Sequence, residues 1–320
     1  MKNINDFKKF MTTKVNLNQS RIDILNAKIK TIKAILSEKL RGYRKIEKQG
    51  SYALQTIIKP VQENDEFDAD ILVYMKKQHN WSASDYITAI FDIFSGDNNY
   101  RSIIRKKTRC ITLDYKGDFH IDIVPAIEIN SQIYICNSES NKLERTDGSG
   151  FRDWFLKKNE TTSGQLKRVV RLFKFLRDHK KNFSAKSILV ATVLGNVVDG
   201  SKEYPDIPSA LKTLVCELDE FLQANKTMPI IANPAMPEED FNRHWDQNKY
   251  SNFRDKVHIY YQKILQAFEE EDKDSSIRMW RKIFGDSFGS IIGTSNRNTV
   301  KIPPQKPYAN SDFLQKIHEY

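Results

Sequence analysis

Two aspartates with β-strand spacing are the first residues of this chain that suggest a particular chemistry. Asp68 and Asp70 lie directly before the apolar segment 71–75 (ILVYM), and residues two apart on a strand point to the same face, about 7 Å apart. Two carboxylates on one face repel each other unless a cation lies between them, and Mg²⁺ takes such oxygen ligands. Asp65 and Glu66 belong to the same acidic cluster, and Glu66 with Asp68 is a competing pair. We assign Asp65 and Glu66 to the loop, because only Asp68 and Asp70 adjoin the apolar strand.

A third carboxylate on a later strand would allow two metal ions to be held, and Asp122 is the best candidate. The segment 119–127 (FHIDIVPAI) alternates so that Asp122 faces away from its flanking isoleucines. An ionised aspartate inside so apolar a strand is costly unless it is paired or bound to metal. Asp114 and Asp118 are alternatives, although Asp118 is next to Gly117 in an expected hairpin turn.

A Gly-Ser pair ahead of the aspartates has the chemistry of a phosphate site. Gly50 and Ser51 stand between an expected extended segment, 43–49, and an expected short helix, 53–58. A glycine lets the backbone approach a ligand closely, and a serine hydroxyl with free N–H groups at a helix start can bind phosphate. A Gly-Ser turn, an Asp-x-Asp pair and a later aspartate, in this order, are what two-metal nucleotidyl transfer requires.

This constellation resembles the polymerase-β-like nucleotidyltransferase superfamily, whose pattern is Gly-Ser, then Asp-x-Asp, then a separate Asp. The run GSYALQT, residues 50–56, is also similar to the Gly-Ser-x₄-Thr form of the branch that makes oligonucleotide second messengers. That branch includes bacterial cyclic-oligonucleotide synthases, animal cyclic GMP-AMP synthase and oligoadenylate synthases. The resemblance implies attack of a ribose hydroxyl on the α-phosphate of a nucleoside triphosphate, with release of pyrophosphate.

The resemblance also implies roles for the motif residues. Three carboxylates would hold two Mg²⁺ ions, with Mn²⁺ as an alternative, and the last would also accept the proton of the attacking hydroxyl: Asp68, Asp70 and Asp122. The donor triphosphate would be bound by Gly50 and Ser51, with Gln49 as a weaker candidate.

Two segments in the second half of the chain extend the resemblance. Residues 164–179 (GQLKRVVRLFKFLRDH) resemble the family's first helix after the core, whose phosphate-gripping lysine matches Lys174. From helical spacing alone, Lys174 shares a basic face with Lys167 and Arg171.

Residues 184–196 (SAKSILVATVLGN) resemble the next helix of the family, in which a serine contacts the triphosphate. Ser187 matches it, and Ser184 is the alternative as a helix cap. Ile188 stands where the animal enzyme has an aromatic residue that stacks on a base, so the base contact here is left open.

The elements that position these residues divide the chain into an α+β half and a helical half. We expect helices at 18–41 and 84–94, and strands at 43–49, 69–75, 103–115, 119–127 and 132–136. Helices follow at 165–179, 185–198, 209–224, 250–270 and 275–284. The expected fold is α+β, a polymerase-β-like nucleotidyltransferase core with a mixed sheet followed by a C-terminal helical domain.

The active site would lie in the cleft between a nucleotidyltransferase core, 1–160, and a helical substrate-binding domain, 161–288. Helix 18–41 would serve as a spine across both. A flexible tail, 289–320, would serve a partner; the alternative is that its apolar residues pack back onto the helical lobe: Tyr308, Phe313, Leu314 and Ile317. Two further segments resemble parts of bacterial members: 232–245, a turn-rich Asn-Pro segment, and 280–288 (WRKIFGDSF), which closes the fold.

Composition limits the other readings. The chain has 320 residues and a net charge of +10, which favours a polyanionic partner such as a nucleotide or nucleic acid. Its three cysteines form no Cys-x-x-Cys motif, and we expect a cytoplasmic protein with no signal peptide and no membrane span.

We therefore predict a Mg²⁺-dependent synthase of a cyclic di- or trinucleotide second messenger, made from nucleoside triphosphates that include ATP, in bacterial anti-phage signalling. The resemblance implies accessory regulatory or effector proteins and leaves a nucleic-acid activator open. The alternatives are a linear oligoadenylate synthase, an RNA- or small-molecule-modifying nucleotidyltransferase, and a non-catalytic nucleic-acid-binding protein.

Overall fold

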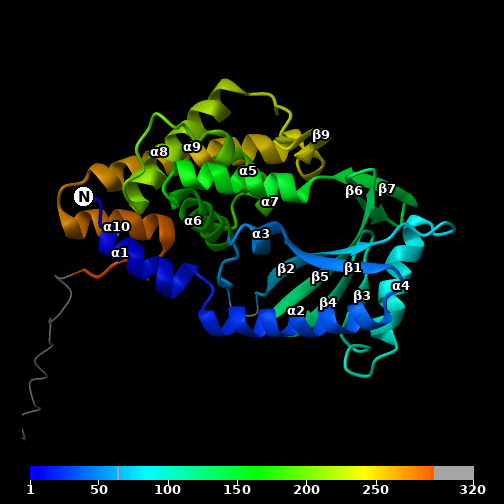
Figure 1. Ribbon diagram of the computed structural model, residues 1–320. Helices are drawn as coiled ribbons and strands as arrows, with labels where there is room; N and C mark the ends of the chain where they lie inside the picture. Colours follow the sequence, from blue (N-terminus) through cyan, green and yellow to red (C-terminus); the bar gives the residue numbers. More distant parts are fainter. Residues whose placement is uncertain (63–64, 292–320) are drawn as a thin grey trace, which may run out of the picture.

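The computed structural model describes residues 1–62 and 65–291, and it has a sheet lobe and a helical lobe (Figure 1). The sheet lobe is built on a seven-stranded sheet with the path β1-β2-β5-β4-β3, to which β6 and β7 are added beside β5. Only β2 and β5 pair in parallel among these strands, so the sheet is mixed, as predicted. The strands are β1 (Tyr43–Gln49), β2 (Phe67–Met75), β3 (Ile104–Lys106), β4 (Ile111–Tyr115), β5 (Phe119–Ile129), β6 (Gln132–Asn137) and β7 (Lys142–Thr146).

One face of this sheet is buried by two helices, α2 (Gln19–Lys39) and α4 (Ala83–Ser95). Alternation along β2 explains which side chains they cover: Phe67, Ala69, Ile71, Val73 and Met75 all belong to the core beneath α2 and α4. The residues between them, including Asp68 and Asp70, therefore project from the opposite face, toward the helical lobe.

The helical lobe packs its own apolar core. Its helices are α5 (Gly148–Thr161), α6 (Gln165–Lys180), α7 (Ser187–Asn196), α8 (Ile207–Ala224), α9 (Gln247–Glu269) and α10 (Lys273–Phe284). A small hairpin, β8 (Ala232–Asn233) and β9 (Met236–Asp240), precedes the 3₁₀ turn η2 (Phe241–His244). The four-residue helix α3 (Gly50–Ala53) lies between the lobes, and its contacts include β2 on one side and α7 on the other.

The N-terminal segment connects the two lobes through two helices rather than one. Helix α2 starts where the side chain of Asn18 accepts a hydrogen bond from the backbone of Arg21, and its buried residues belong to the sheet-lobe core. The preceding α1 (Ile4–Phe10) and π-helical turn η1 (Met11–Val15) belong to the helical-lobe core instead. Figure 1 shows α1 beside α10, at the end of the molecule away from the sheet's outer strands.

Other differences from the expected elements have local causes. The expected single strand 103–115 is a hairpin, because the chain turns between β3 and β4, where the backbone of Lys107 bonds to that of Cys110. The helix expected at 53–58 begins at Gly50 and ends at Ala53. Helices α1 and α5 and strand β7 were not expected. Residues 292–320, most of the expected tail, lie outside the described residues.

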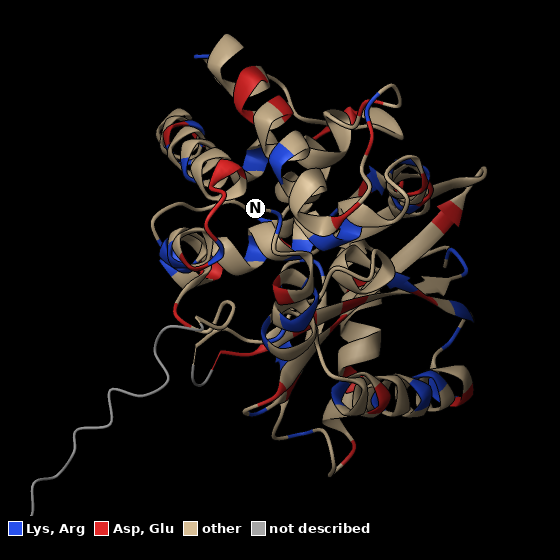
Figure 2. Ribbon diagram, turned by 90° about the vertical axis from the view of Figure 1, so that its left-hand side faces the viewer, with Lys and Arg blue, Asp and Glu red and all other residues tan. Residues whose placement is uncertain are grey.

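Charge is spread over both lobes. In Figure 2, basic and acidic residues are interspersed on helices of both, and no face of a single sign is seen in that view. Among the described residues, no helix is long and apolar enough to cross a bilayer.

Phe7 tests how strongly the N-terminal segment holds the helical lobe. Its ring is fully buried and lies 4.9 Å, centroid to centroid, from the rings of both Trp280 and Phe288. Phe7→Ala should lower the free energy of unfolding by about 3–5 kcal/mol, because it leaves a cavity in an aromatic cluster. Ile24→Ala, at an exposed position of α2, should change it by less than about 0.5 kcal/mol in the same denaturant titration. Equal losses from the two variants would contradict this packing.

Candidate active site

Three carboxylates meet on the face of the sheet that looks toward the helical lobe. Strands β2 and β5 are parallel and in register, so that Asp70 pairs with Asp122 and Asp68 pairs with His120. Residues paired across neighbouring strands project to the same face. Asp68 is exposed at the start of β2, whereas Asp70 and Asp122 are partly buried. The structure therefore brings together the three aspartates that the sequence analysis selected.

Asp122 is held by two donors that the sequence analysis did not find. The hydroxyl of Thr112, fully buried on β4, donates to Oδ1 of Asp122, and the two residues are paired in the sheet. The ammonium of Lys107 lies 3.2 Å from both oxygens of the same carboxylate. The contact of Thr112 can be recognised only from the register of β4 against β5, and the contact of Lys107 only from the β3–β4 hairpin.

The carboxylates repel one another in the protein without metal. Burial, followed by the charges of Asp122 and Asp68, raises the pKa of Asp70 to about 7, whereas Lys107 and Lys174 act in the opposite direction. A divalent cation among these oxygens would relieve that repulsion, and oxygen ligands are those that Mg²⁺ and Mn²⁺ accept. The donor set therefore fits the predicted metal ions.

Gly50, the first residue of α3 directly after strand β1, lies against this cluster. Its φ is +58°, and a Cβ at this position would lie 2.5 Å from Oδ2 of Asp70. Both facts require glycine, and together they bring the backbone of α3 against the carboxylates. The preceding residue, Gln49, is paired with Asp70 in the β1–β2 ladder, and its side-chain amide lies close to Gly148.

The predicted nucleotide-binding residues line two cavities. A cavity of about 280 Å³ is lined by four residues of the predicted set from four elements: Ser51, Asp68, Lys174 and Ser187. A larger cavity of about 520 Å³ is lined by the others: Gln49, Gly50, Asp70 and Asp122. Gly50 and Ser51 are adjacent in the chain, and Asp68 and Asp70 are neighbours on one face of β2. The two cavities thus flank the start of α3.

Lys174 is the buried cation of this region. Its ammonium donates to the backbone carbonyl of Thr56 at 2.8 Å, and burial followed by the charge of Arg177 lowers its pKa to about 7. Lys167, which was expected on the same helix face, bonds to the side chain of Gln55 next to Thr56. This face of α6 therefore packs on the segment after α3. Lys174 lines the smaller cavity together with Arg177 and Asp178 of the same helix, whereas Lys167 does not.

The two serine candidates differ in position. Ser187 is the first residue of α7 and lines the smaller cavity. Ser184 is exposed, and its carbonyl accepts a hydrogen bond from the indole of Trp245. Ile188 lines the larger cavity together with Phe241 and Asn233, so apolar and aromatic surface is present there.

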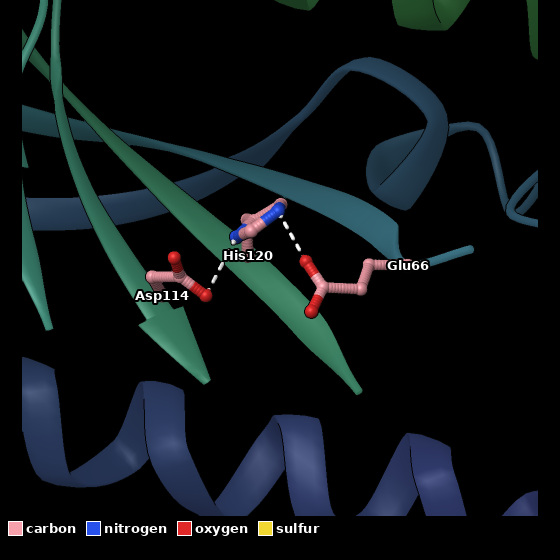
Figure 3. Close-up of side chains that lie close together, drawn as sticks. All are labelled: Glu66, Asp114 and His120. Carbon is pink, nitrogen blue, oxygen red and sulfur yellow. Dashed lines mark ion pairs between the residues drawn. The ribbon is translucent and has the colours of Figure 1, made fainter. Parts of the chain in front are cut away.

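A second acidic cluster lies at the end of the same sheet where β2 and β5 begin (Figure 3). His120 is placed between two carboxylates, with Nε2 at 2.5 Å from Glu66 and Nδ1 at 3.4 Å from Asp114. The three side chains offer ligand atoms within 4.8 Å of one another. Each carboxylate also has a second partner, since Glu66 accepts from the backbone of Gly117 and Asp114 pairs with Arg105. Glu66 and Asp114 thus contact His120, and Asp118, the other alternative, pairs with Arg21.

Comparison with known proteins gives consistent matches. Residues 1–159 match the family described as the Second Messenger Oligonucleotide or Dinucleotide Synthetase domain. The c-di-GMP synthase of Roseivirga ehrenbergii is 25% identical over 273 residues, which cover 73% of this chain and 71% of that protein. The cyclic AMP-AMP-AMP synthase of Escherichia coli is 22% identical over 321 residues, which cover 88% and 96% of the two chains.

Solved structures share the fold. The structure of Escherichia coli MS115-1 CdnC with ATP has a TM-score of 0.73 at 20% identity and covers 90% of this chain and 99% of its own. The same bacterial protein has also been solved as a complex named CdnC:HORMA-deltaN, with a TM-score of 0.70 at 18% identity over 90% and 98% of the two chains. The similarity thus extends over both lobes.

Gly50→Ala tests the contact between α3 and the carboxylates. The new methyl group would displace the side chain of Asp70, so Mn²⁺ affinity should fall about tenfold or more. Gly117→Ala is the matched control, because Gly117 also has a positive φ, +79°, but a Cβ there would meet nothing within 4 Å. Isothermal titration of both folded variants with Mn²⁺ measures the difference. Equal affinities would contradict the contact.

Asp70→Asn tests the raised pKa of this carboxyl through the pH dependence of stability. The folded-state pKa of Asp70, about 7, is above the unfolded value of about 3.9, so the folded protein binds the extra proton between these values. The contribution of Asp70 to the free energy of unfolding of the wild type therefore falls as the pH rises from about 3.9 to about 7. In EDTA, Asp70→Asn should gain more in melting temperature over wild type at pH 8 than at pH 5. Asp255→Asn, an exposed control on α9, should show no such trend. A pH-independent gain for Asp70→Asn would contradict the raised pKa that burial and the neighbouring carboxylates give Asp70.

Proposed function

The chain belongs to the bacterial cyclic-oligonucleotide synthases of the polymerase-β-like nucleotidyltransferase superfamily, and we propose that it joins nucleoside triphosphates, ATP among them, into a cyclic di- or trinucleotide. The observation that carries this proposal is the in-register pair of Asp70 and Asp122 beside Gly50. The curated relatives include makers of both a dinucleotide and a trinucleotide, which is why the ring size is stated as a range.

We assign the predicted roles to the residues as follows. Asp68, Asp70 and Asp122 would hold two Mg²⁺ ions, which when bound lower the pKa of the attacking hydroxyl and stabilise the leaving pyrophosphate. Asp122 would accept the proton of the attacking ribose hydroxyl at a carboxylate oxygen. Thr112 would keep that carboxylate in one orientation through its hydrogen bond to Oδ1.

The smaller cavity would hold the donor triphosphate. Its lining combines the hydroxyls of Ser51 and Ser187 with the ammonium of Lys174, and these groups suit phosphate oxygens. The buried ammonium at present bonds to one backbone carbonyl, so a phosphate would replace a neutral partner with a charged one. The larger cavity, with Asn233, Phe241 and Ile188 in its lining, would take the acceptor nucleotide, and Gln49 lies at its border.

We further propose a role in anti-phage signalling with accessory proteins. The structure of the Escherichia coli relative in the complex named CdnC:HORMA-deltaN supports this proposal, and a partner of this kind would bind the present chain.

The product assay separates this function from its alternatives. The enzyme is incubated with all four nucleoside triphosphates and Mg²⁺, without an acceptor, and the products are analysed by mass spectrometry before and after phosphatase treatment. A cyclic product resists phosphatase, because it has no terminal phosphate. The double variant Asp68→Asn, Asp70→Asn should remain folded and make none.

Other outcomes assign the other functions. A phosphatase-sensitive oligoadenylate would indicate a linear synthase, and turnover only after an RNA or small-molecule acceptor is added would indicate a modifying enzyme. No turnover at all, with nucleic-acid binding that survives Asp70→Asn, would indicate a binding protein.

Lys174→Ala tests the donor site. Losing a charge-assisted contact to the triphosphate costs about 1.5–3 kcal/mol, so kcat/KM should fall about tenfold or more. Lys167→Ala is the control on the same helix face, since its ammonium bonds to Gln55 outside the cavity lining. Small and equal effects from both would contradict the assignment of Lys174.

A further inference from the structure

The contact between Lys107 and Asp122 has the geometry of a cation site that is filled by a side chain. The Lys107 ammonium lies at 3.2 Å from both carboxylate oxygens, on the side where a shared cation binds a carboxylate. No other contact of Lys107 to a carboxylate is found among the described residues.

The two donors to Asp122 differ in how freely they can leave. Thr112 is fully buried and fixed by the pairing of β4 with β5. The side chain of Lys107 is 51% exposed and extends from the hairpin turn on four flexible carbons. One donor therefore holds the orientation of the carboxylate, while the other can exchange with a cation from solvent.

The backbone of the turn would not have to move in this exchange. Arg109, in the same turn, donates two hydrogen bonds to Glu144 on β7, and the carbonyl of Thr108 accepts from Ser138. The turn is anchored by these contacts, so that only the Lys107 side chain needs to change position.

We propose that Lys107 is an internal counter-ion, which occupies the cation position at Asp122 in the metal-free enzyme and is displaced when a divalent ion binds. This inference rests on the proposed role of Asp122 as a metal ligand. Lys107 offsets part of the repulsion among the carboxylates when no metal is present, and the ammonium and the metal ion compete for the same two oxygens.

Mn²⁺ binding to the full chain without nucleotide tests the proposal, with free Mn²⁺ measured by electron paramagnetic resonance. Lys107→Met should bind Mn²⁺ about three- to fivefold more tightly than wild type. The reason is that wild type must first break the partly exposed ion pair between Lys107 and Asp122, and this weakens its Mn²⁺ binding by about that factor. The same variant should melt at a lower temperature than wild type in EDTA and recover when Mn²⁺ is added. If Lys107 only stabilised the fold, Lys107→Met would melt at a lower temperature than wild type but would bind Mn²⁺ no more tightly.

Two control variants isolate the charge. Lys106→Met should leave Mn²⁺ affinity unchanged, because the Lys106 ammonium donates to Thr88 and does not contact Asp122. Lys107→Arg keeps the charge and can bind the carboxylate with two parallel hydrogen bonds, so it should bind Mn²⁺ no more tightly than wild type. If Lys107→Met resembles wild type, or if Lys107→Arg resembles Lys107→Met, the counter-ion proposal is wrong.

Asp122→Asn separates this failure from failure of the proposed function. If Asp122→Asn binds Mn²⁺ as well as wild type, Asp122 is not a metal ligand and both proposals fall. If Asp122→Asn loses Mn²⁺ while Lys107→Met shows no gain, the metal assignment stands and only the counter-ion is refuted.

Discussion

Repulsion among three carboxylates that cannot turn away from one another is the constraint on which the site depends. Asp70 and Asp122 are paired across parallel strands, and the residues beside them in each strand are buried under α2 and α4. Rotating either strand to separate the charges would expose that core, which costs far more than the repulsion. The sheet therefore keeps the carboxylates together, and cations must compensate them.

The surroundings of the carboxylates supply that compensation from both lobes. Lys107 comes from the β3–β4 hairpin of the sheet lobe, and Lys174 comes from α6 of the helical lobe. Gly50 brings α3 close enough for its backbone to border the same charges. The position of Lys174 depends on the packing of α6 against the segment after α3, which in turn depends on the helical-lobe core that α1 helps to build.

The sequence predicted the parts of this arrangement that follow from local periodicity. The two-residue spacing of Asp68 and Asp70 before the apolar run 71–75 predicts that the two carboxylates share one face, and the helix expected at 18–41 corresponds to α2. Family motifs then selected Lys174 and Ser187. The contacts of Thr112 and Lys107 with Asp122 could not be predicted. They depend on the register of β4 against β5 and on the turn between β3 and β4, and the continuous β-rich run 103–115 gives no sign of that turn. Helix α1 was not predicted, because its aromatic side chains pack on α10, which is distant from it in the sequence.

The most direct test of the account is the position of Mn²⁺ in crystals of the full chain grown with a non-hydrolysable ATP analogue. Anomalous scattering should place Mn²⁺ within ligand distance of Asp68, Asp70 and Asp122, with the Lys107 ammonium withdrawn from Asp122. Mn²⁺ at Glu66, Asp114 and His120 instead, with the three aspartates free of metal, would contradict it.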